Sequence, residues 1–125
     1  MPAERRLKTI LLVEDDPEIR ASMSDILEQH GYYVRTAANG VEALEQLRES
    51  GSITIILLDL MMPRMNGFEF RERQLQDPTL ATLPVIVITA YGQMAEKVAA
   101  LGQVPCLRKP VDYQELIALI ERLTT

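Results

Sequence analysis

The chain has 125 residues, of which 47% are hydrophobic and 25% charged; these values are typical of a single globular domain (core about residues 8–123) and exclude a disordered chain. Its net charge of -5 argues against direct contact with nucleic acid, and no apolar run approaches the roughly 20 residues that a membrane helix needs. One cysteine, Cys106, permits no internal disulfide, so we expect a reducing, cytoplasmic location.

The first part of the chain predicts two units of strand and helix. Residues 8–13 are a short apolar run that predicts a strand, and residues 32–37 predict a second strand. The helix after the first strand begins at Pro17 with Asp16 as its cap, and Asn39 caps the helix after the second.

Residues 53–58 are an unbroken apolar run that ends in Asp59. Only a parallel strand covered by helices on both faces is apolar at every position, so we predict a central buried strand with a carboxylate at its C-terminal end. A loop then leads to a third helix over about residues 67–74, whose thin apolar stripe consists of Phe68 and Leu75.

Two further strands and helices complete the chain. Residues 85–88 predict a fourth strand, and the spacing of apolar residues over 94–101 indicates a fourth helix. Residues 104–107 predict a fifth strand, which Pro105 places at the edge of the sheet. A well-formed amphipathic helix follows, with Asp112 as its cap.

Five strands that alternate with five helical segments imply parallel β/α units with right-handed crossovers. Five units are too few for an eight-fold barrel. We therefore predict an α/β fold with a doubly wound, five-stranded parallel sheet and helices on both faces.

The residues that follow the strands collect at one edge of such a sheet, where ligands of open α/β sheets bind. They are three acids, a hydroxyl and an ammonium: Glu14, Asp15, Asp59, Thr89 and Lys109. Clustered carboxylates repel one another unless a cation joins them, and Mg²⁺ suits a small site of hard oxygen ligands. The combination is typical of phosphoryl transfer to a carboxylate, although each residue alone also has an ordinary structural explanation.

Four motifs, LLVEDD, LLDLMMPRMNG, VIVITA and LRKP, resemble in this order the receiver domains of two-component response regulators, of the chemotaxis-regulator type. The resemblance covers essentially the whole chain. It implies a flavodoxin-like fold with strand order 2-1-3-4-5, and it makes Asp59 the acceptor of a phosphoryl group. The domain would catalyse only its own aspartyl phosphorylation and dephosphorylation.

The resemblance also implies the remaining site residues. The implied Mg²⁺ ligands are Glu14, Asp15, Asp59 and the backbone carbonyl of Met61. Asp15 would bind the ion directly, whereas Glu14 would act mainly through water. Thr89 corresponds to the switch hydroxyl of the family and Lys109 to its phosphate-binding lysine, whose bond to the following proline is commonly cis.

The chain departs from the family at the fifth strand. An aromatic residue that swings inward on phosphorylation is usual there, but this chain has Cys106, preceded by an unusual Pro105. Neither change removes an atom of the site, so we expect phosphate acceptance to survive while the readout changes. Cys106 itself is predicted to be a small buried residue rather than a reactive thiol.

Three other functions compete with this interpretation. A receiver-like binding module that works without phosphorylation would accommodate Cys106, but the intact acids and lysine disfavour it. A phosphatase of the haloacid dehalogenase type needs a second aspartate where Met61 stands. A flavodoxin-type flavin site needs hydroxyls and amides in the first loop, which is acidic here.

The expected partners are a histidine kinase or histidine phosphotransfer protein as donor, and a downstream protein or effector domain. We expect no contact with nucleic acid or membrane, and a phosphorylation-dependent dimer is a further option. His30, near the end of the first helix, is a poor phosphodonor because it lies far from the site edge. The sequence fits both a stand-alone regulator and one domain of a longer protein.

Overall fold

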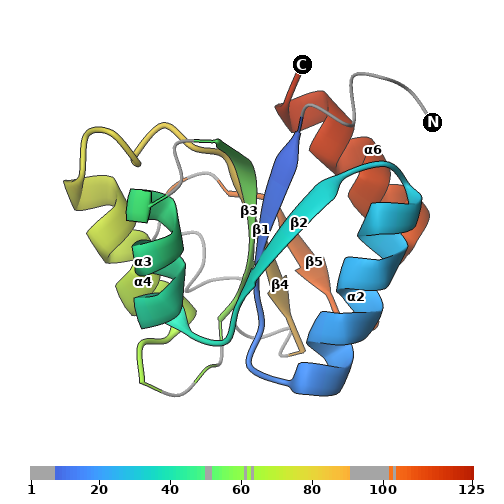
Figure 1. The fold of residues 1–125 in the computed structure, drawn as a ribbon, viewed down its shortest axis with the longest axis horizontal. Coiled ribbons are helices and arrows are strands. Elements are labelled where there is room, and N and C mark those ends of the chain that lie inside the picture. The colour runs from blue at the N-terminus through green and yellow to red at the C-terminus, as the bar shows by residue number, and fades with distance from the viewer. Residues whose placement is uncertain (1–7, 50–51, 61, 63, 91–101, 103) are drawn as a thin grey trace.

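The computed structural model describes residues 8–49, 52–60, 62, 64–90, 102 and 104–125 (Figure 1). Within these residues, strands and helices have the following bounds: β1 Thr9–Val13, α2 Pro17–Gln29, β2 Tyr33–Ala37, α3 Gly40–Glu49, β3 Ile53–Asp59, α4 Gly67–Gln76, β4 Val85–Thr89, β5 Cys106–Arg108 and α6 Tyr113–Leu123. None of the described helices is long and apolar enough to cross a membrane.

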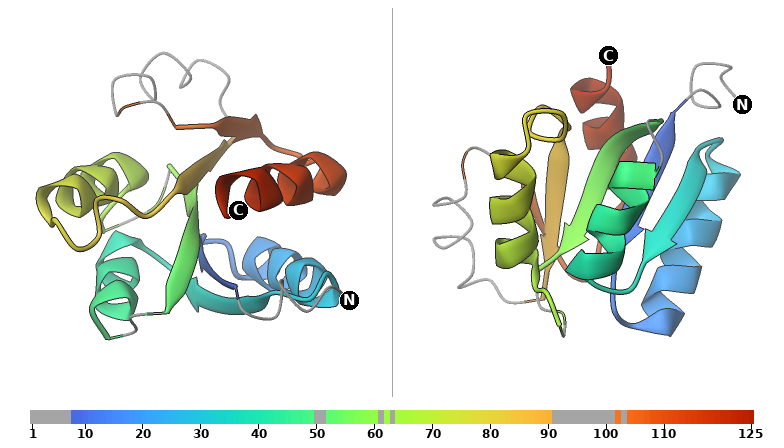
Figure 2. Two further views of the ribbon diagram at one scale, coloured as in Figure 1. Left: turned by 90° about the horizontal axis from the view of Figure 1, so that it is seen from above. Right: turned by 60° about the vertical axis from the view of Figure 1, so that its left-hand side comes forward.

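All strand pairs are parallel, and the sheet has the order β2-β1-β3-β4-β5, so the predicted doubly wound fold is confirmed. Helices α2 and α6 cover one face of the sheet, and α3 and α4 cover the other (Figure 2). Four of the five predicted helices are present; the predicted helix over 94–101 lies outside the described residues.

Two apolar cores, one on each face, explain why the inner strands are apolar at every position. Along β1, Ile10 and Leu12 belong to the core beneath α2 and α6, whereas Leu11 and Val13 belong to the core beneath α3 and α4. Strand β3 alternates in the same way from Ile55 to Leu58, and only Thr54 among its residues is not buried. The strand is therefore fixed from both sides up to Asp59.

Side-chain caps start the helices where the sequence predicts. The carboxylate of Asp16 accepts hydrogen bonds from the backbone N–H groups of Glu18 and Ile19 at the start of α2. Asp112 caps α6 in the same manner, and the Asn39 side chain accepts from the backbone N–H of Glu42 in α3. These bonds satisfy donors that the first helical turn leaves open.

Helix α4 corrects one prediction. Its inward residues are Phe70 and Gln74, both fully buried, whereas Leu75 of the predicted stripe is 46% exposed. The Gln74 amide group donates to the backbone carbonyls of Leu80 and Leu83, so a polar side chain occupies a core position with its hydrogen bonds made. A pattern of apolar residues cannot reveal such a position.

Strand β5 is shorter than predicted and begins at Cys106, although its place at the sheet edge is confirmed. Pro105 precedes the strand, and its carbonyl accepts a hydrogen bond from the Val87 backbone N–H. Cys106 is half-buried against the core beneath α3 and α4, not fully buried as expected. Burial raises the pKa of its thiol, which therefore stays protonated near neutral pH.

Candidate functional site

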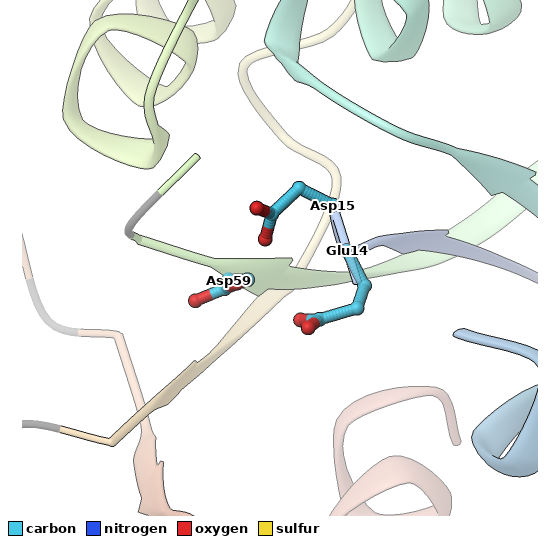
Figure 3. Close-up of side chains that lie close together, drawn as sticks. All are labelled: Glu14, Asp15 and Asp59. Atoms are coloured by element: carbon cyan, nitrogen blue, oxygen red, sulfur yellow. The ribbon is translucent and has the colours of Figure 1, made fainter. Parts of the chain in front are cut away.

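Two neighbouring strands bring three carboxylates to the C-terminal edge of the sheet (Figure 3). Glu14 and Asp15 follow β1, and Asp59 ends β3. One carboxylate oxygen from each residue lies within 4.8 Å of the other two. Glu14 is only 2% exposed and Asp59 6%, while Asp15 is the most exposed of the three. The acids form a partly buried cluster that needs a cation.

Lys109 supplies positive charge to this cluster. Its ammonium nitrogen Nζ lies 3.1 Å from both carboxylate oxygens of Glu14 and 3.6 Å from Oδ2 of Asp59. Burial acts to lower the pKa of Lys109, but the two carboxylates raise it by more, so its pKa lies above the ordinary value. Lys109 is therefore charged at neutral pH and joins two buried acids.

Thr89 ends β4 at the same edge. Asp59 is paired with Ile88 across β3 and β4, which places Thr89 one residue beyond that pair. Thr89 is 1% exposed, and its backbone carbonyl accepts a hydrogen bond from the Lys109 backbone N–H at 2.9 Å. The peptide bond after Lys109 is cis, as the family resemblance implies.

A cavity of about 230 Å³ opens between these side chains. Its lining consists of Glu14, Asp15, Asp16, Ile19, Asp59, Ala90 and Lys109. At about 30 Å³ per water molecule, the cavity has room for a small hydrated cation or a phosphoryl group. The three carboxylates are hard oxygen donors, so the residues fit Mg²⁺ by their chemistry. Met61, whose carbonyl is the fourth expected ligand, lies outside the described residues.

Sequence reasoning missed Arg20. From the second turn of α2, its guanidinium nitrogen Nη1 donates to the backbone carbonyls of Glu14, at 2.9 Å, and Asp15, at 3.4 Å. Arg20 lies one helical turn after the cap Asp16, and that spacing was the only available signal. No motif of charged side chains indicates a bond to backbone oxygen.

Sequence reasoning also missed how the loop after β3 is held. The Gly40 backbone N–H donates to the Met65 carbonyl, and the Gly67 N–H donates to the Leu60 carbonyl. A Cβ atom on Gly67 would lie 2.7 Å from Cα of Leu60. Glycine is therefore required where α4 starts against the end of β3.

His30 lies at the C-terminal cap of α2. The acidic loop precedes the other end of this helix, which has 13 residues. At about 1.5 Å per residue the two are roughly 20 Å apart, so an internal transfer from His30 does not fit the fold.

Comparison with known proteins gives one consistent family. The family model of the response regulator receiver domain matches residues 10–121. The Haemophilus influenzae transcriptional regulatory protein CpxR homolog is 40% identical over 119 residues, which cover 94% of this chain and 50% of that protein. An uncharacterized 14.6 kDa protein in the sodA1 3' region of Leptolyngbya boryana is 41% identical, over 90% of this chain and 87% of that protein.

Solved structures agree with the sequence relatives. Chemotaxis protein CheY4 of Vibrio cholerae is 29% identical with a TM-score of 0.84, covering 94% of this chain and 98% of that one. Response regulator TrrA of Thermotoga maritima, in complex with Mg(2+)-BeF, is 28% identical with a TM-score of 0.83, covering 93% and 98%. The chain spans about half the length of relatives such as the CpxR homolog. By fold, site and sequence, it belongs to the response regulator receiver domains of two-component systems.

Proposed function

We propose that Asp59 accepts a phosphoryl group from a phosphohistidine on a histidine kinase or histidine phosphotransfer protein. The observation that carries this proposal is the buried Asp59 carboxylate beside Lys109, in the lining of a cavity that three further acids also line. A carboxylate oxygen of Asp59 attacks phosphorus, the donor's phosphorus–nitrogen bond breaks, and the freed imidazole takes up a proton.

Glu14, Asp15, Asp59 and the backbone carbonyl of Met61 would hold Mg²⁺, which when bound offsets the negative charge of the transferring group. The Lys109 ammonium contacts a phosphoryl oxygen, and it gives up part of its contact with Glu14 to do so. The Thr89 hydroxyl donates a hydrogen bond to the same group. The domain then catalyses only its own phosphorylation and the hydrolysis that ends it.

The donor's docking surface is proposed to lie beside Lys109. A groove of about 480 Å³ runs between α2 and the segment after β5, and its lining is mostly apolar, with Ile19, Met23 and Val111. A helix of the donor that covers this groove would bring its phosphohistidine to the edge that carries Asp59.

The output is proposed to pass through β5 and α6 to a downstream protein or effector domain. On β5, half-buried Cys106 stands where the family usually has an aromatic residue. The movement of the Thr89 hydroxyl toward the phosphoryl group is therefore transmitted by backbone shifts of β5, with which Thr89 is paired. We propose residues 1–125 as one cytoplasmic domain, and phosphorylation-dependent dimerisation as one form of output.

Intact mass after incubation with Mg²⁺ and acetyl phosphate tests the acceptor. The wild type should gain one phosphoryl group, Asp59→Asn should gain none, and Asp77→Asn, at the C-terminal cap of α4 with Thr79 as its side-chain partner, should behave as wild type. An equal gain in Asp59→Asn would contradict the assignment. If the wild type neither gains a phosphoryl group nor binds Mg²⁺, a binding module that works without phosphorylation becomes the better account.

A further inference from the structure

The Arg20 side chain holds the acidic loop after β1 through hydrogen bonds to the loop's backbone. Its Nη1 donates to the Glu14 carbonyl at 2.9 Å and to the Asp15 carbonyl at 3.4 Å. Its own backbone N–H donates to the Asp16 carbonyl at 2.9 Å. The last of these is the ordinary backbone bond of the first helical turn, so the Arg20 side chain itself binds two consecutive carbonyls, those of Glu14 and Asp15.

The Glu14 peptide is also fixed from the other side, because its N–H donates to the Ala37 carbonyl of β2 at 3.0 Å. Because both backbone groups of Glu14 are held, the direction of its Cα–Cβ bond is fixed. The carboxylate therefore lies toward Asp59 and Lys109. Arg20 supplies the half of this restraint that comes from α2.

We propose that Arg20 is a positioning residue that aligns Glu14 and Asp15 for a divalent cation. The inference rests on the proposed function, because it assigns Arg20 a role in the same metal site. Arginine suits the role because its guanidinium is planar, always charged and offers several donors in a fixed array, whereas a lysine ammonium is a single point charge.

A positioning role and simple charge repulsion predict opposite effects of removing Arg20 on the affinity for Mg²⁺, which makes the proposal testable. Arg20 carries a positive charge close to the acids, so Coulomb repulsion alone means that its removal should tighten the binding of Mg²⁺. If Arg20 aligns the ligands, its removal should weaken Mg²⁺ binding despite the lost repulsion. Removal of a hydrogen-bond partner that orients a metal ligand typically costs about 10- to 100-fold in affinity.

The experiment is isothermal titration with Mg²⁺ of the wild type, Arg20→Met, Arg20→Lys and the control Arg48→Met. Arg48 is exposed on α3, so its variant matches the change in net charge without touching the acidic loop. We expect about tenfold weaker binding for Arg20→Met, at the lower end of that range because the bonds are to backbone, and a smaller loss for Arg20→Lys. Arg48→Met should bind as the wild type does.

Unchanged or tighter binding by Arg20→Met would overturn the proposal. Thermal unfolding without Mg²⁺ identifies variants that fail to fold, and if Arg20→Met is one of them, Arg20→Lys decides: weaker binding supports the proposal and wild-type binding overturns it. Phosphorylation by acetyl phosphate at saturating Mg²⁺ should return to the wild-type rate, which a damaged fold would not allow. Absence of Mg²⁺ binding in the wild type would instead overturn the proposed function.

Discussion

Strands β3 and β5 serve the same site under opposite structural conditions. Strand β3 is seven residues long, lies between β1 and β4, and is buried at every position but Thr54. Strand β5 has three residues at the sheet edge, with two half-buried and one exposed. Asp59 ends β3, and Lys109 follows β5 directly. The proposed acceptor is thus fixed by the core, while the lysine that we propose to contact the phosphoryl group directly follows the least buried strand.

The largest difference between the two strands should appear when one leucine on each is shortened. Leu57 and Leu107 contribute to the same core beneath α2 and α6, but Leu57 is fully buried and Leu107 is half-buried. Leu57→Ala should lower the free energy of unfolding by about 3–4 kcal/mol, and Leu107→Ala by about half as much. Urea denaturation measures both. Equal losses would mean that β5 is held as firmly as β3.

Gly67→Ala tests how closely the loop after β3 is fitted. The added Cβ would lie 2.7 Å from Cα of Leu60 and 2.9 Å from the Asp59 carbonyl oxygen, and backbone atoms cannot yield as a side-chain end can. We expect a loss of about 2 kcal/mol in unfolding free energy and slower phosphorylation of Asp59. A stable Gly67→Ala protein with wild-type phosphorylation would show that the end of β3 adjusts freely.

Lys109→Met should destabilise the metal-free protein at neutral pH. Glu14 and Asp59 would remain buried without their cation, and removal of one partner of a fully buried pair costs about 3–5 kcal/mol. Because the Lys109 side chain is 20% exposed, we expect a smaller loss of about 2 kcal/mol in the free energy of unfolding. Arg48→Met provides the control for net charge in the same unfolding measurement.

The pH dependence of stability shows whether protonated Lys109 stabilises the folded protein. The folded state raises the pKa of Lys109 above its ordinary value of 10.5, so the protonated form is favoured by folding. This contribution is complete below that value and is lost as the pH rises through the raised pKa. The wild type should therefore lose stability in alkaline solution more steeply than Lys109→Met. Parallel curves above pH 10.5 would contradict the pairing.

The smallest expected effect concerns Cys106. Burial raises the pKa of its thiol, and the thiolate is the reactive form, so alkylation by iodoacetamide at pH 8 should be slower than in urea-unfolded protein. A rate equal to that of the unfolded chain would show that β5 does not shield the thiol at all.

The same contrast explains what the sequence could predict. Strand β3 is apolar from Ile55 to Leu58, and its predicted start at Ile53 and the place of Asp59 at its C-terminal end follow from that pattern and the parallel topology. Strand β5 is too short for a periodic pattern, and its predicted start was two residues early because Val104 and Pro105 precede the ladder. Edge strands lack the two-sided burial that makes the pattern visible.

Polar side chains account for the other errors. Gln74 takes a core position because its amide bonds to loop carbonyls, and Arg20 reaches backbone oxygens that every residue possesses. Such partners have no signature in residue type, so neither contact could be derived from the sequence. The assembly of the charged residues at one edge could be derived, since parallel strands all end there.

The contact between Lys109 and Glu14 also bears on how many ions the proposed metal site would hold. Three carboxylates and one ammonium give the group of Glu14, Asp15, Asp59 and Lys109 a formal charge of -2, which one divalent ion cancels. After the first ion has bound, no net charge remains to attract a second, and monovalent ions leave the group undercompensated. In the proposed metal site the Lys109 ammonium would therefore serve as a built-in counter-ion, and the charge balance of these four side chains favours one bound divalent ion over two.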